Sequence, residues 1–217
     1  MPPLTLTRRK LMETAAAMGG AMAGWAGSLG AARAAPASLA FLAMGDWGRD
    51  GAFNQREVGQ AMGVAANELN SAFVLALGDN FYEDGVQSVE DPKWRTSFED
   101  IYTAPSLQTP WYVALGNHDY HGSPEAEIAY SAKSRRWRMP SRYYVQSLTA
   151  PDGATVDIFV TDTSPMVRQY WEGEEPKTKV KDQDVPAQLA WPSAPTGRSP
   201  PATTQCIPAE NTAPQPS

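Results

Sequence analysis

The chain has 217 residues, 42% of them hydrophobic and 10% aromatic, which is enough length and apolar content for one sizeable globular domain. Its formal net charge of -6 disfavours binding to nucleic acid or to anionic membranes, so we set both partners aside. The single cysteine, Cys206, cannot form an internal disulfide and therefore neither requires nor excludes an oxidising compartment.

Residues 1–34 have the pattern of an export signal. The paired Arg8 and Arg9 precede a long Ala/Gly/Met stretch, and Ala32 and Ala34 are small residues at the positions that a signal peptidase reads. We interpret the segment as a twin-arginine signal peptide, which implies the twin-arginine export machinery as a partner and a periplasmic or secreted location. An amphipathic amino-terminal helix is the alternative. Glycines interrupt the stretch and argue against a membrane span.

Three short apolar runs follow, and each ends in glycine and then Asp or Asn. They are S-L-A-F-L-A-M-G-D (38–46), S-A-F-V-L-A-L-G-D (71–79) and P-W-Y-V-A-L-G-N (110–117). Apolar runs of this length bounded by glycine are typical of buried β-strands that are covered on both faces. We therefore expect three buried strands.

Apolar side chains at helical spacing separate these runs. We expect one helix over residues 54–69 and a second over residues 91–102, which begins with Asp-Pro. The expected buried stripes consist of Val58, Met62, Ala65 and Leu69 in the first helix and of Trp94, Phe98 and Ile101 in the second. Strand, helix, strand, helix and strand in this order predict a parallel α/β sheet.

The remaining chain predicts one more helix, a hairpin, a loop and a tail. The helix is expected over residues 125–137, and two β-runs around the Asp152-Gly153 turn, within residues 142–163, predict a hairpin. Residues 172–186 are charged and contain prolines, which is typical of a loop. Residues 192–217 are rich in Pro, Ser, Thr and Ala and predict a disordered tail.

Polar residues follow all three expected strands. Asp46, Asp79 and Asn117 would lie at the carboxyl ends of neighbouring parallel strands, where open α/β sheets place their ligands. Two-metal phosphoesterases need hard oxygen ligands around a pair of cations that are roughly 3.5–4 Å apart. Taken singly, each motif could equally be a tight turn or an Asn turn with a capping Asp. Three of them in order favour a metal site.

The motifs G-D-W-G (45–48), G-D-N-F-Y (78–82) and G-N-H-D-Y (116–120) together resemble the amino-terminal half of a purple acid phosphatase of the tartrate-resistant type. That group lies within the calcineurin-like metallophosphoesterase superfamily. The similarity runs from about Leu39 to Trp191. It implies an α/β fold, in which residues 38–191 form part of a β-sandwich flanked by helices in α-β-β-α order.

The resemblance also implies a role for each matching residue. Asp46 would ligate a ferric iron, Asp79 would bridge the two metals, and Tyr82 would bind the iron as a phenolate. Asn117 would bind the second metal, which is iron, zinc or manganese in the family. His118 would orient the phosphate and protonate the leaving alkoxide, a role that suits a side chain that titrates near neutrality. The implied substrate is a small phosphomonoester or a phosphoprotein.

Other residues near these motifs have simpler interpretations. His121 is interpreted as a solvated loop histidine, with a contact to the phosphate at the rim of the cleft as the alternative. Trp47 and Phe81 are interpreted as packing residues. The basic group Arg135, Arg136, Arg138 and Arg142 is interpreted as a solvated face, although it could attract phosphoesters.

The sequence departs from the family in one respect that affects the chemistry. The family completes its site with a Gly-His motif and a Gly-His-x-His motif, whereas this chain has two histidines in total, His118 and His121. The second metal would keep only Asp79 and Asn117, so we expect weak metal binding and little turnover. The sudden change of composition after Trp191 further suggests a truncated or frameshifted copy.

Two functions of different classes therefore remain open. The first is acid phosphatase activity through a dinuclear metal centre. The second is an inactive remnant that binds at most one metal or a phosphate without turnover. Tyr82 disfavours a third possibility, a phosphodiesterase or nucleotidase of the same superfamily, because many other members lack this tyrosine.

Overall fold

The computed structural model describes residues 38–174 and 177–191. The expectations for the signal peptide at 1–34, for the tail at 192–217 and for Cys206 lie outside the described residues. Within the described ranges, no helix combines the length and the apolar character that crossing a membrane requires.

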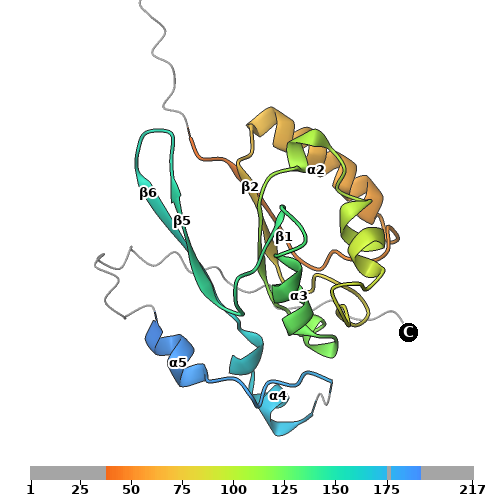
Figure 1. Ribbon diagram of the computed structural model, residues 1–217, viewed down its shortest axis with the longest axis vertical. Coiled ribbons are helices and arrows are strands. Elements are labelled where there is room, and N and C mark those ends of the chain that lie inside the picture. Colours follow the sequence, from red (N-terminus) through yellow and green to blue (C-terminus); the bar gives the residue numbers. More distant parts are fainter. Residues whose placement is uncertain (1–37, 175–176, 192–217) are drawn as a thin grey trace, which may run out of the picture. The chain divides into compact units, whose positions relative to one another are not determined.

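The centre of the fold is a four-stranded parallel sheet in the order β1-β2-β3-β4, of which Figure 1 labels β1 and β2. Its strands are β1 (Phe41–Met44), β2 (Phe73–Leu77), β3 (Trp111–Ala114) and β4 (Trp137–Arg138). The register pairs Phe41 with Phe73 and Val74 with Trp111. The parallel α/β sheet predicted from the apolar runs is confirmed, with one strand more than expected.

Large aromatic side chains fill the space between the sheet and the helices. The fully buried ones include Trp94, Phe98, Tyr102, Trp111 and Trp137. Trp47 and Phe81, which flank the candidate ligands in sequence, belong to the same core and pack with their ring centroids 5.7 Å apart. The interpretation of these two residues as packing residues is confirmed.

Helix α2 (Gln55–Leu69) forms where it was expected, but a different face of it is buried. The buried positions are Gln55, Gly59, Gly63 and Ala66. Val58 and Leu69, which were expected inside, are about half exposed. Small residues occupy the buried face because the helix lies close to a later loop. Cβ atoms added to Gly59 and Gly63 would meet Ile101 and Ala104 of that loop.

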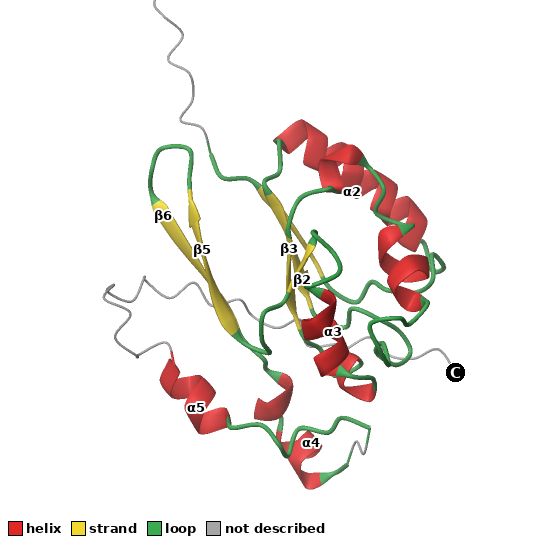
Figure 2. Cartoon of the chain, viewed as in Figure 1, coloured by secondary structure: helices red, strands yellow, loops and turns green. Residues whose placement is uncertain are grey.

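The second expected helix is present as a short π-helix, η1 (Trp94–Glu99), followed by the 3₁₀ turn η2 (Pro105–Leu107). Trp94, Phe98 and Ile101 are all buried, so the predicted stripe is confirmed. Figure 2 shows α2 on one side of the sheet and the β5–β6 hairpin on the other.

The helix expected over residues 125–137 is wrong in its second half. Helix α3 spans only Pro124–Tyr130, and its N-cap Ser123 accepts a hydrogen bond from the amide of Ala126 at 3.2 Å. The chain then leaves the helix because Trp137 enters the core as part of β4 and pairs with Trp111 of β3.

The basic group Arg135, Arg136, Arg138 and Arg142 was interpreted as a solvated face, and this is wrong for Arg136 and for Arg142, whose side chain is 12% exposed and pairs with Glu125. Arg136 is buried, forms an ion pair with Glu99 and donates a hydrogen bond to the backbone oxygen of Tyr102 at 2.7 Å. The helix that would have exposed it ends at Tyr130, so the chain turns this guanidinium inward, toward its partners.

The predicted hairpin is confirmed as β5 (Tyr144–Thr149) and β6 (Thr155–Val160), which pair antiparallel. The Tyr144 hydroxyl connects it to the main sheet, because it accepts a hydrogen bond from the amide of Val113 in β3 at 2.8 Å. The remaining elements are η3 (Asp119–His121), η4 (Ser164–Met166), α4 (Arg168–Glu172) and α5 (Val185–Ala190).

Candidate metal centre

Two of the expected ligands lie at the ends of neighbouring strands, and the local backbone turns both of them to the same edge. Asp46 follows β1 and Asp79 follows β2, with left-handed φ values of 57° and 47°. Aspartate tolerates this conformation better than most residues do. The Asp46 amide donates to the Gly78 oxygen at 3.1 Å, which joins the two strand ends directly.

The hydroxyl of Tyr82 lies between these two carboxylates. Its oxygen is 2.6 Å from Oδ1 of Asp46 and 2.8 Å from Oδ2 of Asp79. The Tyr82 amide donates to the Gly48 oxygen at 2.7 Å, which fixes the tyrosine over the first strand end. Three oxygen atoms that hard cations prefer therefore converge at one point.

In the metal-free protein this hydroxyl keeps its proton. Burial raises the pKa of Tyr82 well above its ordinary value, and the hydrogen bonds and negative charges of Asp46 and Asp79 raise it further. A phenolate next to two carboxylates would be a cluster of three negative charges, which only a nearby positive charge could stabilise. The donor set is therefore suited to a cation.

The third strand end carries Asn117 and His118. The His118 amide donates to Oδ1 of Asp79 at 3.0 Å, and its ring lies 4.4 Å from the ring of Tyr82, centroid to centroid. Asn117 is half-buried in the same loop. The structure thus connects Asp46 and Asp79 through the Tyr82 hydroxyl and places His118 against Asp79 and Tyr82, with Asn117 adjacent in the chain.

The approach of the third loop depends on Gly116. A Cβ atom at this position would lie 2.2 Å from Oδ1 of Asp79 and 2.3 Å from its backbone nitrogen. No side chain fits at such a distance, so only glycine lets the loop after β3 lie against the loop after β2.

Sequence reasoning missed Arg49. Its guanidinium carbon is 3.6 Å from the centroid of the Tyr82 ring, and its Nη1 atom is 3.6 Å from the carboxylate of Glu83. A cation over an aromatic face in this range is favourable. The only signal in the sequence was its place directly after the G-D-W-G motif.

His121 was interpreted as a solvated loop histidine, and this is wrong. Its side chain is 5% exposed and contacts Asp84 at 3.2 Å through Nδ1 and Thr178 at 3.1 Å through Nε2. Thr178 comes from a segment 57 residues further along the chain, so no local sequence pattern could have indicated that it contacts His121.

Two buried acidic residues lie close to the same loops. Burial raises the pKa of Asp119 to about 8, although amide hydrogen bonds from Gly116, Asn80 and Phe81 oppose the rise. Burial and the charge of Asp119 raise the pKa of Glu127 well above its ordinary value. The two carboxyl groups therefore favour a state in which one of them is protonated. Asp119 accepts several N–H bonds, whereas Oε1 of Glu127 has no hydrogen-bond partner among the described residues, so we assign the proton to Glu127.

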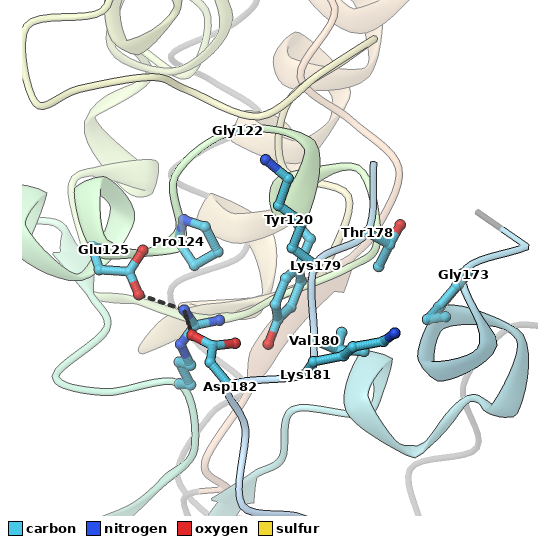
Figure 3. A pocket seen from close by; sticks show the side chains of 12 residues that line it. Tyr120, Gly122, Pro124, Glu125, Gly173, Thr178, Lys179, Val180, Lys181 and Asp182 are labelled. Carbon is cyan, nitrogen blue, oxygen red and sulfur yellow. Dashed lines mark hydrogen bonds and ion pairs between the residues drawn. The ribbon is translucent and has the colours of Figure 1, made fainter. Parts of the chain in front are cut away.

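A separate cavity of about 560 Å³ borders Tyr120 (Figure 3). Arg142 lies on its wall, paired with Glu125 and 3.9 Å from Asp182. Its ring neighbour Tyr120 donates a hydrogen bond to the buried Asp162. None of the sequence-predicted site residues lines this cavity.

The donor set fits one cation better than two. In the described ranges, no three His, Cys, Asp or Glu side chains are grouped so that they could hold a metal ion. A first cation would instead rely on Asp46, Asp79 and Tyr82, whose oxygens already converge. A second would have Asp79 and Asn117, which is a small set for tight binding.

Comparison with known proteins gives a consistent result. Residues 39–201 match the calcineurin-like phosphoesterase family. Purple acid phosphatase 7 of Arabidopsis thaliana is 46% identical over 141 residues, which are 65% of this chain and 42% of that protein. Tartrate-resistant acid phosphatase type 5 of Oryctolagus cuniculus is 38% identical over 169 residues, covering 74% of this chain and 52% of that one.

Among solved structures, GAP50, the anchor in the inner membrane complex of Plasmodium, superimposes with a TM-score of 0.53 at 23% identity. The superposition covers 65% of this chain and 48% of the GAP50 chain, and at 23% identity the likeness concerns the fold alone. The chain thus spans roughly two fifths to one half of the length of the curated relatives described above.

Proposed function

This chain belongs to the calcineurin-like phosphoesterase family, and on that premise we propose that it is an acid phosphatase that hydrolyses phosphate monoesters at a dinuclear metal centre. The observation that carries the proposal is the position of the Tyr82 hydroxyl, within hydrogen-bond distance of both Asp46 and Asp79. The identities of 46% and 38% to a purple and a tartrate-resistant acid phosphatase support it.

In this proposal Asp46, Asp79 and Tyr82 hold the first cation, a ferric iron, and Asp79 and Asn117 hold a second, which is iron, zinc or manganese. When bound, such cations supply Lewis acids that polarise a phosphate group and lower the pKa of water. The carboxylate of Asp79 belongs to both sets, since one oxygen contacts Tyr82 and the other contacts the amide of His118.

His118 is the residue that we assign to the leaving group. Its Nδ1 atom contacts the backbone oxygen of Glu83. Because a carbonyl oxygen only accepts, Nδ1 must carry a hydrogen, and Nε2 is then the atom that holds the proton for the departing alkoxide. The contact between its ring and that of Tyr82 keeps the imidazole beside the carboxylates.

Hydrolysis of para-nitrophenyl phosphate at mildly acidic pH, with the bound metal measured in parallel, tests the proposal. We expect low turnover in the wild type, because the chain has two histidines in total, and a further fall of at least about 100-fold in Asp79→Asn, because this change removes the bridging charge. The matched control is Asp157→Asn, which changes a half-buried aspartate of β6 whose carboxylate accepts a hydrogen bond from the Ser147 hydroxyl. Equal turnover in Asp79→Asn and the wild type would refute the metal mechanism.

One observation favours a second candidate, a remnant that binds one metal or a phosphate without turnover. The chain has two histidines, and His121 is engaged by Asp84 and Thr178. A protein that binds iron with a visible absorption band but hydrolyses no phosphomonoester would support this candidate.

We further propose that residues 1–34 direct export through the twin-arginine machinery to the periplasm or beyond, where a small phosphomonoester or a phosphoprotein is the substrate. The pattern of Arg8 and Arg9 before an Ala/Gly-rich stretch supports this. Fractionation of cells that express an Arg8→Lys, Arg9→Lys double variant tests it, and unchanged export would contradict it.

A further inference from the structure

Arg49 lies over the aromatic ring whose hydroxyl joins the two candidate carboxylate ligands. Its guanidinium carbon is 3.6 Å from the centroid of the Tyr82 ring and 5.5 Å from the centroid of the Phe53 ring. At 3.6 Å the guanidinium plane must lie roughly parallel to the Tyr82 ring, because a nitrogen turned toward the ring would overlap with its atoms. The N–H groups, which lie in the guanidinium plane, therefore point sideways past the edges of the ring.

The loop after β1 fixes the backbone of Arg49. Its amide donates a hydrogen bond to Oε1 of Gln55 at 3.0 Å, and its carbonyl oxygen accepts one from the amide of Ala52 at 2.8 Å. Gln55 is itself buried and donates to the backbone oxygen of Ser97 at 2.7 Å. The Arg49 side chain is 28% exposed, so it starts from a fixed backbone and is still accessible to a solute.

The guanidinium of Arg49 keeps its donors unused, unlike those of several other arginines. The side chains of Arg136, Arg142 and Arg168 each donate a hydrogen bond to a carboxylate. Within the described ranges the Arg49 guanidinium donates no hydrogen bond, and its ion pair with Glu83, at 3.6 Å, is too long to be one. Because the Glu83 side chain is 80% exposed, solvent and salt screen this pair.

The charges around the candidate ligands indicate what these donors could bind. Asp46, Asp79 and a Tyr82 phenolate would carry three negative charges, which offset the three positive charges of a ferric ion. The loaded cluster would therefore attract a phosphate anion only weakly from a distance. Among the described residues, Arg49 is the one Lys or Arg side chain with an ion pair, hydrogen bond or cation–π contact to any of these three ligands.

We propose that Arg49 binds the phosphate group of the substrate through its guanidinium N–H groups. The inference rests on the proposed function, because it needs the metal-loaded site, but it involves the first cation alone. A planar guanidinium matches two oxygens of a phosphate group, which gives two parallel hydrogen bonds. Stacking on Tyr82 holds the guanidinium in place before the phosphate arrives, so less side-chain freedom is lost on binding.

The test uses the full chain loaded with an equimolar amount of Fe³⁺, and inorganic phosphate is the probe. Phosphate that enters the site changes the surroundings of the iron-bound Tyr82, so the visible absorption reports its binding, and titration calorimetry measures the affinity independently. We expect Arg49→Met to bind phosphate about 10- to 100-fold more weakly than the wild type, the range for hydrogen bonds to a charged group. Arg49→Lys should recover only part of this loss, because an ammonium group lacks the planar fork.

Arg95→Met is the matched control. It removes the same charge from an exposed arginine of η1 that pairs with Asp100, and it should bind phosphate within about twofold of the wild type. All three variants should still bind iron, because Asp46 and Asp79 hold the Tyr82 hydroxyl and Arg49 contacts only the face of the ring.

The outcomes that overturn the inference differ from those that overturn the proposed function. Equal phosphate affinity in Arg49→Met and the wild type, or an equal loss in Arg95→Met, would refute phosphate binding by Arg49 and leave the proposed function standing. Loss of iron binding in Arg49→Met would show that Arg49 supports Tyr82 rather than the phosphate, and it would refute the inference as well. A wild type without the iron absorption would refute the proposed function, and the inference with it.

Discussion

At the scale of single residues, the Tyr82 hydroxyl is the group that keeps Asp46 and Asp79 close together without a metal. It donates toward both carboxylates, whose like charges would otherwise repel each other. Burial and these two neighbours raise the pKa of Tyr82, so the phenol keeps the proton with which it donates in the metal-free protein. Removal of the Tyr82 hydroxyl should therefore change both the stability of the metal-free protein and the properties of the metal-loaded one.

We predict that Tyr82→Phe lowers the free energy of unfolding of the metal-free protein by about 1–3 kcal/mol, because two carboxylates lose a donor. The iron-loaded variant should lack the visible absorption of the wild type. Urea unfolding and absorption spectroscopy measure the two effects. Tyr143→Phe, which changes a half-buried tyrosine that packs on Trp191, is the matched control and should keep the absorption. An unchanged spectrum in Tyr82→Phe would contradict Tyr82 as an iron ligand.

The positions of the candidate ligands Asp46, Asp79 and Asn117 could be predicted from sequence because each follows an apolar run directly. Asp46 and Asp79 lie at adjacent strand ends for that reason alone. Asp119 and Asn80 could not be assigned, since each stands beside a candidate site residue in the same motifs and its contacts depend on which loops come together. His121 was misjudged because its partner Thr178 is distant in the chain.

At the scale of elements, glycines at the strand ends decide how closely the loops approach. Gly116 and Gly45 occupy equivalent places, each directly before a candidate ligand, but their surroundings differ. An added Cβ would lie 2.2 Å from Asp79 at Gly116, whereas at Gly45 the nearest atom, on Leu77, is 3.6 Å away. The second distance is an ordinary contact.

We predict that Gly116→Ala lowers the free energy of unfolding by about 1–3 kcal/mol through overpacking and also weakens metal binding. Gly45→Ala should change the unfolding free energy by less than about 0.5 kcal/mol. Thermal or urea unfolding of the two variants, with metal affinity in parallel, checks the difference. Similar unfolding free energies for the two variants would mean that the loops after β2 and β3 can move apart without an energetic cost. This would contradict the close contact between Gly116 and Asp79.

Helix α2 shows why its extent could be predicted and its buried face could not. The spacing of apolar residues favoured Val58 and Leu69 as core positions, yet close contact with the following loop is possible only through small residues. Burial there depends on how near the helix lies, which composition and periodicity do not reveal. The same limit applies to residues 131–137, where burial of Trp137 in β4 overrides a helical pattern.

We predict that Gly63→Ala destabilises the protein although alanine favours helices. The added methyl group would lie 2.6 Å from Cβ of Ala104, and the strain should exceed the roughly 1 kcal/mol gained in helix propensity. The neighbouring Val64→Ala, at a position that is 60% exposed, should be neutral within about 0.5 kcal/mol. Urea unfolding of both variants is the measurement. A more stable Gly63→Ala variant would contradict the close packing of α2.

At the scale of the whole described region, the first three strands of the main sheet follow from the sequence, but β4 and the contacts that join the other segments to the sheet do not. Asp162, just after β6, makes several of these contacts. Its side chain accepts from the Tyr120 hydroxyl, and its backbone oxygen accepts from Nε2 of Gln188 in α5 at 2.8 Å. It therefore joins the hairpin, the loop after β3 and α5.

This junction should make stability depend on pH. Burial raises the pKa of Asp162 from its ordinary value of 3.8 to about 6, although hydrogen bonding to Tyr120 and the charge of Arg142 oppose the rise. The folded protein therefore binds more protons than the unfolded chain between these two values. A raised pKa in the folded state means that stability is fully present below the unfolded value and is lost as pH rises toward about 6.

We predict that the wild type loses on the order of 3 kcal/mol of unfolding free energy across this interval relative to Asp162→Asn, because a two-unit difference in pKa corresponds to about that energy. The asparagine stays neutral, so the pH profile of the variant should be flatter there, whatever its absolute stability. Urea unfolding of both proteins at several pH values, extrapolated to water, gives the two profiles. Parallel profiles would show that the Asp162 carboxyl group does not change its protonation on folding, and would contradict a raised pKa at this junction.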